Sequence, residues 1–113
     1  MGQNRNKLIA LVIGNLSNSI VHTILEKAVK KEELADKYRK ELITSFDIAK
    51  KYREKINPIN EPLPEKDIFI IRNKIIKRVK SELLIRILKG YENIDLSRIE
   101  NEVDKALREI SIA

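Results

Sequence analysis

The single histidine of the chain, His22, is the residue best placed to carry chemistry. It lies three residues after Ser19 and four residues before Glu26, and side chains at positions i and i+4 meet on a helix. A His–Glu pair could hold a metal or move a proton, and a Ser–His pair is part of many nucleophilic sites. Two ligands do not complete a zinc site, although a dimer axis could double them, and no residue nearby would orient the serine. We therefore expect neither a metal nor catalysis at His22.

The residues around His22 predict an interaction surface instead. They form a helix face that is polar but uncharged until Glu26, whereas the other exposed helix faces of the chain are rich in Lys and Glu. A face of this kind favours hydrogen bonding to another protein surface over contact with open water. The predicted interface residues on it are Asn15, Asn18, Ser19 and His22.

Other enzyme signatures are missing from the sequence. The three glycines are isolated, so no phosphate-binding loop is present. Without cysteine there is no disulfide, thiolate zinc site or thiol nucleophile. Carboxylates occur as helix-surface partners of lysine, as in Glu33 with Lys37. We expect a protein that is not an enzyme and that needs no cofactor or metal.

The net charge of +6 is concentrated in one segment. Residues 68–89 hold seven basic residues and one acid, whereas residues 91–113 hold three basic residues and six acids. A basic helix of this kind could neutralise phosphates of nucleic acid. However, aromatic residues for base stacking are scarce. Lysine-rich solvated helices are also common in thermophilic proteins, and the composition of this chain resembles theirs. The candidate nucleic-acid-binding residues are Lys74, Lys77, Arg78, Lys80 and Lys89.

Arg72 and Arg86 fall on the apolar side of the same predicted helix. An arginine in that position must either extend its head group into water or meet a carboxylate. The nearest plausible partners are Glu100, Glu102 and Asp104, in the same chain or across a dimer. Arg72 and Arg86 are therefore either edge-of-core arginines or anchors of an interface.

The spacing of apolar residues predicts an all-α protein. We expect a single domain, 1–113, of four helices arranged as two antiparallel helical hairpins in a dimeric bundle. A proline-rich connector over 57–64 joins the hairpins, and Gly90 follows the third helix. The predicted helices cover about 4–29, 32–56, 65–89 and 95–111.

The first two helices could instead be one. No Gly or Pro lies between Leu16 and Ile56, so a continuous helix of about 50 residues, about 75 Å long, is an alternative. Such a length is unusual for a chain of 113 residues. Lys27 and Lys31 fall on the apolar stripe, and we expect the break there.

Two segments, Leu8–Ile13 and Leu83–Leu88, are apolar on nearly every side of their helices. Helices of this kind must be covered all round. Four helices provide enough surface to cover one such segment, but they do not readily provide enough to cover two. Since burial of each Leu or Ile contributes about 1.5–3 kcal/mol, the sequence predicts self-association, most simply as a homodimer.

The uncharged run from Leu8 to Leu25 reaches the length of a membrane span. Polar residues such as Asn15, Ser17 and Asn18 interrupt it, and the apolar residues on both sides stay in helical phase. We therefore expect a cytoplasmic protein without a membrane partner or a signal peptide. The leading functional hypothesis is a non-catalytic interaction or assembly protein whose partner is itself or another protein. The alternative is a small basic nucleic-acid-binding protein.

Overall fold

The computed structural model describes residues 4–58 and 61–112 of the chain, and all of its regular structure is helical. This confirms the predicted all-α class, and no strand occurs in those two ranges. Ile59 and Asn60 of the predicted connector lie outside the described residues. The helices are α1 (Arg5–Ala28), α2 (Glu32–Glu54), α3 (Glu65–Leu88) and α4 (Ile99–Glu109), and a 3₁₀ turn, η1 (Leu96–Arg98), precedes α4.

Local signals set the ends of the helices. The Asn4 side chain caps α1 by accepting a hydrogen bond from the Asn6 amide at 2.8 Å. Val29 is extended (φ −89°, ψ 145°), so α1 and α2 are two separate helices. Pro64 precedes α3, and Gly90 follows it with φ +98°, which suits glycine. The predicted fourth helix begins as η1, where the hydrogen bonds of Ser97 hold the pKa of Asp95 below its usual value.

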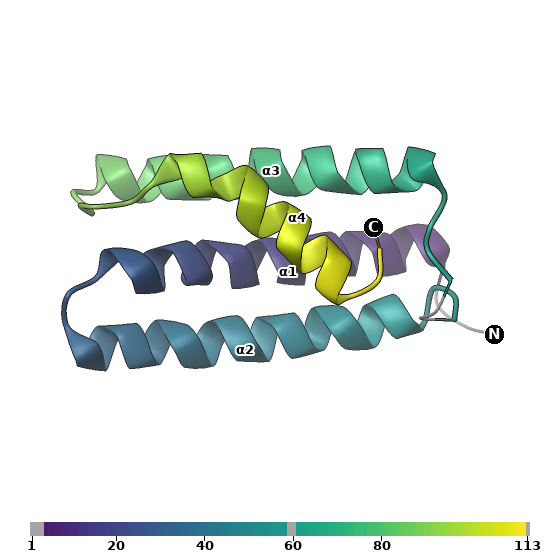
Figure 1. The fold of residues 1–113 in the computed structure, drawn as a ribbon, viewed down its shortest axis with the longest axis horizontal. Coiled ribbons are helices and arrows are strands. Elements are labelled where there is room, and N and C mark those ends of the chain that lie inside the picture. The colour runs from purple at the N-terminus through teal and green to yellow at the C-terminus, as the bar shows by residue number, and fades with distance from the viewer. Residues whose placement is uncertain (1–3, 59–60, 113) are drawn as a thin grey trace.

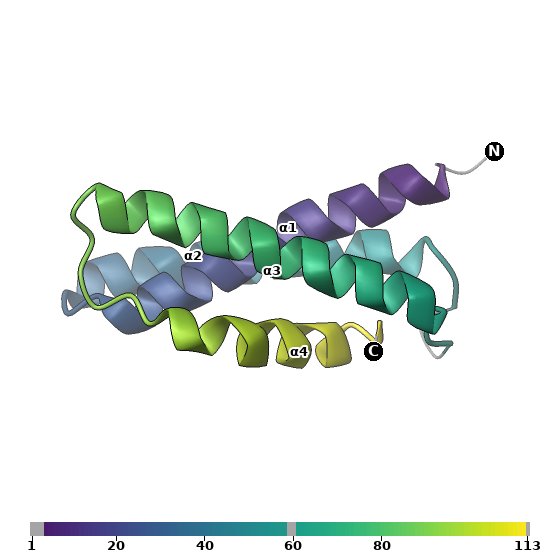
Figure 2. The same cartoon turned by 90° about the horizontal axis from the view of Figure 1, so that it is seen from above.

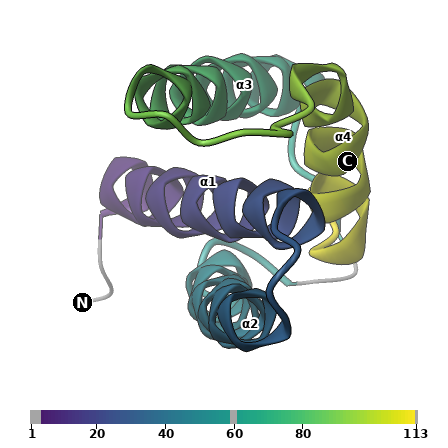
Figure 3. The same cartoon turned by 90° about the vertical axis from the view of Figure 1, so that its left-hand side faces the viewer.

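Helix α1 is the central element of the fold. It lies between α2 and α3 (Figure 1), and α4 lies beside α3 and α1 (Figures 2 and 3). Successive helices reverse direction along the 44 Å long axis (Figure 1). Each of the other three helices contacts α1, and therefore most of the surface of α1 is covered.

The apolar stripe of each helix faces this central element. On α3 the stripe consists of residues four apart, Ile71, Ile75, Val79 and Leu83, all with 0–1% of their surface exposed. On α4, Val103 and Leu107 are buried in the same core. The regular spacing of these residues places one continuous ridge against the neighbouring helices.

The two segments that the sequence marked as apolar all round have different surroundings. In the first, Leu8, Val12 and Ile13 are buried within the chain. In the second, only Leu83 is buried, whereas Leu84 is 41% exposed and Leu88 is 87% exposed. The chain therefore covers one of these segments by itself and leaves the other largely in water.

Helix α1 is long and apolar enough to cross a membrane, and no other described helix passes that test. Its most apolar 18-residue window has a mean hydropathy of 1.7. Within the fold, 61% of that window is buried. The apolar character of α1 is thus accounted for by its central place in the core.

Candidate functional site

The polar face of α1 meets α2 of the same chain. The Ser19 hydroxyl donates to the backbone carbonyl of Leu42 at 2.8 Å, and the Asn18 amide donates to the Ser45 hydroxyl at 2.6 Å. Asn15 donates to the Leu11 carbonyl within α1. The protein surface that Asn18 and Ser19 contact is therefore the second helix of their own chain.

His22 is buried in this contact and both of its ring nitrogens are engaged. Nδ1 lies 2.7 Å from the Asn18 carbonyl oxygen, and Nε2 lies 2.6 Å from a carboxylate oxygen of Glu41. Both ring nitrogens therefore have polar partners within the chain. Glu26 does not contact His22 but lies 3.5 Å from Arg39. The role of His22 in this geometry is to fasten α1 to α2.

Arg72 forms an ion pair with Asp104, one of the three acids predicted as its partners. The Arg72 Nε and Nη2 atoms donate to the two carboxylate oxygens at 2.7 and 3.3 Å. These hydrogen bonds hold the pKa of the Asp104 carboxyl below its usual value and raise that of Arg72. The pair lies within the chain and joins α3 to α4.

Arg86 lies over an aromatic ring instead of pairing with an acid. Its guanidinium carbon is 5.6 Å from the centroid of the Tyr91 ring, a cation–π geometry. Its Nε is buried and has no hydrogen-bond partner within residues 4–58 and 61–112. Arg86 therefore has donor capacity that the chain does not use.

The five predicted phosphate-binding residues are all exposed along α3. Within residues 4–58 and 61–112, none of them forms an ion pair. At a turn of 100° per residue, their side chains fall within about half of the circumference of the helix. The set consists of Lys74, Lys77, Arg78, Lys80 and Lys89.

Exposed apolar side chains gather at the C-terminal end of α3. We call this surface the α3 patch. Its residues are 37–87% exposed and occupy the outward half of the last helical turns and the residue after Gly90. Large exposed apolar patches are rare on monomeric proteins and are common at interaction surfaces. The α3 patch consists of Leu84, Ile85, Ile87, Leu88 and Tyr91.

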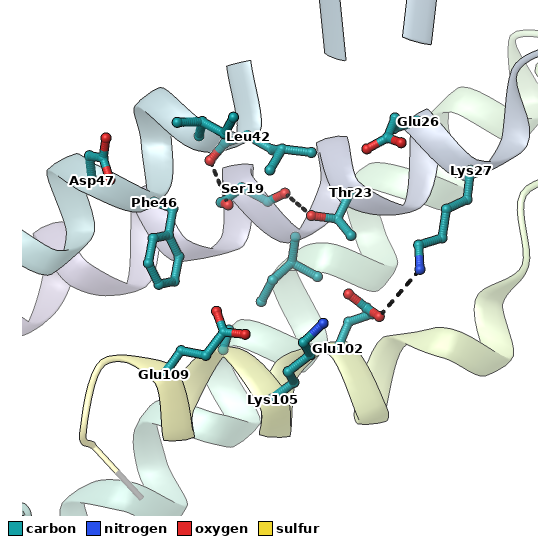
Figure 4. A pocket seen from close by; sticks show the side chains of 13 residues that line it. Ser19, Thr23, Glu26, Lys27, Leu42, Phe46, Asp47, Glu102, Lys105 and Glu109 are labelled. Carbon is teal, nitrogen blue, oxygen red and sulfur yellow. Dashed lines mark hydrogen bonds and ion pairs between the residues drawn. The ribbon is translucent and has the colours of Figure 1, made fainter. Parts of the chain in front are cut away.

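A groove with a volume of about 320 Å³ lies between α1, α2 and α4 (Figure 4). Apolar side chains such as Ile20, Phe46 and Ala106 line it. Charged residues on its rim include four acids and two lysines: Glu26, Asp47, Glu102, Glu109, Lys27 and Lys105. Lys27 and Glu102 lie 4.0 Å apart and form an ion pair across the rim (Figure 4). We call this feature the acidic groove. No sequence pattern predicts this groove, because its walls come from three separate helices.

No group of three or more histidine, cysteine or acidic residues in the described part of the chain could hold a metal ion. Comparison of the chain with known protein families, with curated proteins and with solved structures found no match.

Proposed function

We propose that this chain is a non-catalytic helical interaction protein that assembles with a second copy of itself. The observation that carries the proposal is the α3 patch, which no other part of the described chain covers. Burial of the surface that Leu84 and Leu88 still expose would contribute about 2–4 kcal/mol to an assembly. Within each copy, α1 with α2 and α3 with α4 would serve as the two antiparallel hairpins of a dimeric bundle.

The charge of the molecule favours the acidic groove of a second copy as the surface that receives the α3 patch. Direct contact between two α3 patches would bring together two segments of net charge +6, and like charges held close together disfavour an interface. The acidic groove instead offers apolar walls and a rim with a net charge of −2. Lysines beside the patch, such as Lys80 and Lys89, would then face carboxylates.

Sedimentation velocity at micromolar concentration tests this proposal. The native chain is expected to sediment as a species larger than 13.1 kDa. Replacement of both Leu84 and Leu88 by glutamate is expected to weaken association at least hundredfold, because burial of two leucines is lost and two charges are introduced. Ile43→Glu, which changes an exposed wall residue of the acidic groove, is expected to weaken it as well.

Phe69→Glu provides the matched control for these variants. Phe69 is an exposed apolar residue on the same helix, about 28 Å from Leu88, and this change is expected to leave association intact. A native chain that sediments at 13.1 kDa over the whole concentration range would refute self-association. If the double leucine variant dissociates but Ile43→Glu does not, the α3 patch forms the contact and the acidic groove does not.

Nucleic-acid binding is the second candidate function, favoured by the five exposed α3 cations that lack ion-pair partners in the described ranges. If all five contact phosphates, affinity for a labelled duplex is expected to fall about 500-fold between 50 and 200 mM salt. Fluorescence anisotropy measures this slope. Charge reversal at Lys74, Lys77 and Arg78 is expected to abolish binding. Binding that is insensitive to salt, or unchanged in this triple variant, would exclude α3 as the binding surface.

A further inference from the structure

A small polar cavity lies in the seam between α1 and α3. Its volume is about 150 Å³, room for a few water molecules or one small anion. Helix α1 contributes mostly small side chains to it, and α3 contributes two arginines and an acid. The lining residues are Gly14, Ser17, Asn18, Val21, Arg78, Glu82 and Arg86.

Two residues that line this cavity each have a buried polar side-chain atom with no hydrogen-bond partner among the described residues. Ser17 is only 2% exposed. Its hydroxyl oxygen and the Nε atom of Arg86 are both buried. In the described part of the chain only three buried side-chain polar atoms lack a partner, and these are two of them. Leaving such a group unpaired costs about 1–3 kcal/mol, so their presence in one cavity indicates a ligand that satisfies both.

The charge of the cavity selects an anion. The Arg78 guanidinium lies over Gly14, with Nη1 3.7 Å from the point that a Cβ atom would occupy. Glu82 lies one helical turn from each arginine, yet among the residues of the two described ranges it forms no ion pair with either. Two guanidinium groups and one carboxylate leave a net charge of +1. In the adjoining cavity, Lys74 lies one helical turn from Arg78 on the same side of α3.

We propose that this cavity binds a phosphate group of a small molecule, inorganic phosphate being the simplest. Its oxygens would accept hydrogen bonds from the Ser17 hydroxyl, Arg86 Nε and the Arg78 guanidinium. Guanidinium groups match phosphate oxygens in geometry, and hydrogen bonds to a charged acceptor are the strong ones. With Lys74 counted, the seam carries a net charge of +2, which the charge of a phosphate, about −1.5 to −2 at neutral pH, balances better than a carboxylate does.

Titration of the ¹⁵N-labelled chain with inorganic phosphate at constant ionic strength tests this proposal. In two-dimensional NMR spectra, the amide signals of residues 14–18 and 78–86 are expected to shift and reach saturation. Arg86→Gln removes the charge and is expected to weaken binding at least tenfold. Ser17→Ala is expected to weaken binding while leaving the melting temperature in chloride equal or higher, because it removes an unpaired buried hydroxyl.

Lys77→Gln is the matched control, since it removes one charge from α3 outside the cavity and is expected to leave phosphate binding unchanged. Acetate in place of phosphate is expected to give no saturable shift at the same residues. The proposal is overturned if phosphate shifts no signals there, or if Ser17→Ala and Arg86→Gln bind as tightly as the native chain. It is also overturned if Arg86→Gln, Ser17→Ala and the control Lys77→Gln all weaken phosphate binding equally. That result would show that phosphate does not bind specifically in this cavity.

Discussion

Replacement of Arg53 by methionine is expected to lower the free energy of unfolding by about 3–5 kcal/mol, the largest loss from any single change outside the apolar core. Arg53 is 0% exposed and is the largest fully buried side chain of the described chain. Methionine retains much of its volume, so the loss would come from hydrogen bonds and not from a cavity. No sequence pattern marked this residue.

The Arg53 guanidinium holds three distant parts of the chain together. It donates to the side-chain oxygen of Asn57 at 2.6 Å, to the carbonyl of Glu61 at 2.8 Å and to the carbonyl of Ser111 at 2.9 Å. The end of α2, the connector and the C-terminal segment thus share one cation. Burial lowers the pKa of Arg53, but an arginine stays charged at neutral pH. Without it, several buried oxygens lose their donor.

Urea denaturation followed by circular dichroism measures this loss. Lys51→Met is the matched control, because Lys51 is an exposed cation on the same helix and its replacement is expected to change stability by less than about 0.5 kcal/mol. Arg53→Lys is expected to restore little, since an ammonium does not reproduce the forked geometry. A loss below about 1 kcal/mol for Arg53→Met would show that these hydrogen bonds do not anchor the fold.

Replacement of Leu83 by alanine is expected to cost about 2–5 kcal/mol, whereas the same change at Leu88 costs the isolated chain less than about 0.5 kcal/mol. The two leucines are five residues apart on α3, but Leu83 is 0% exposed and Leu88 is 87% exposed. The difference follows from burial alone, since the truncation is identical.

Thermal and urea unfolding at two protein concentrations separate core packing from assembly. The loss for Leu83→Ala is expected to be the same at both concentrations. For Leu88→Ala, self-association through the α3 patch predicts a loss at the higher concentration only, because binding of a partner stabilises the folded state. Equal and large losses for Leu88→Ala at both concentrations would contradict the exposure of Leu88 in the free chain.

Features that depend on neighbours in sequence were predictable. Pro64 and Gly90 bracket α3 because one fits the start of a helix and the other adopts a positive φ at its end. The repeat of Ile75, Val79 and Leu83 indicated the buried side of that helix. The pairing of Arg72 with Asp104 is one of the two arrangements that the sequence left open for this arginine, the other being a head group in water.

Features that require two or more helices to meet were not predictable. The polar residues of α1 indicated a protein contact, but only the packing of α2 identified Ser45, Leu42 and Glu41 as their partners. The role of Arg53, the acidic groove and the cavity at Ser17 all depend on residues that are far apart in the chain. The periodicity of a single segment does not show which distant residues that segment will contact.

By itself the sequence determined the helical class, the ends of α3 and the charge contrast between residues 68–89 and 91–113, because each follows from local propensity and residue type. Tertiary structure alone decided which of two equally apolar segments is covered. The central position of α1 gives Leu8, Val12 and Ile13 neighbours on other helices, whereas the last turns of α3 leave Leu84 and Leu88 exposed. Burial depends on the number of neighbouring elements, and that number is a property of the packed chain.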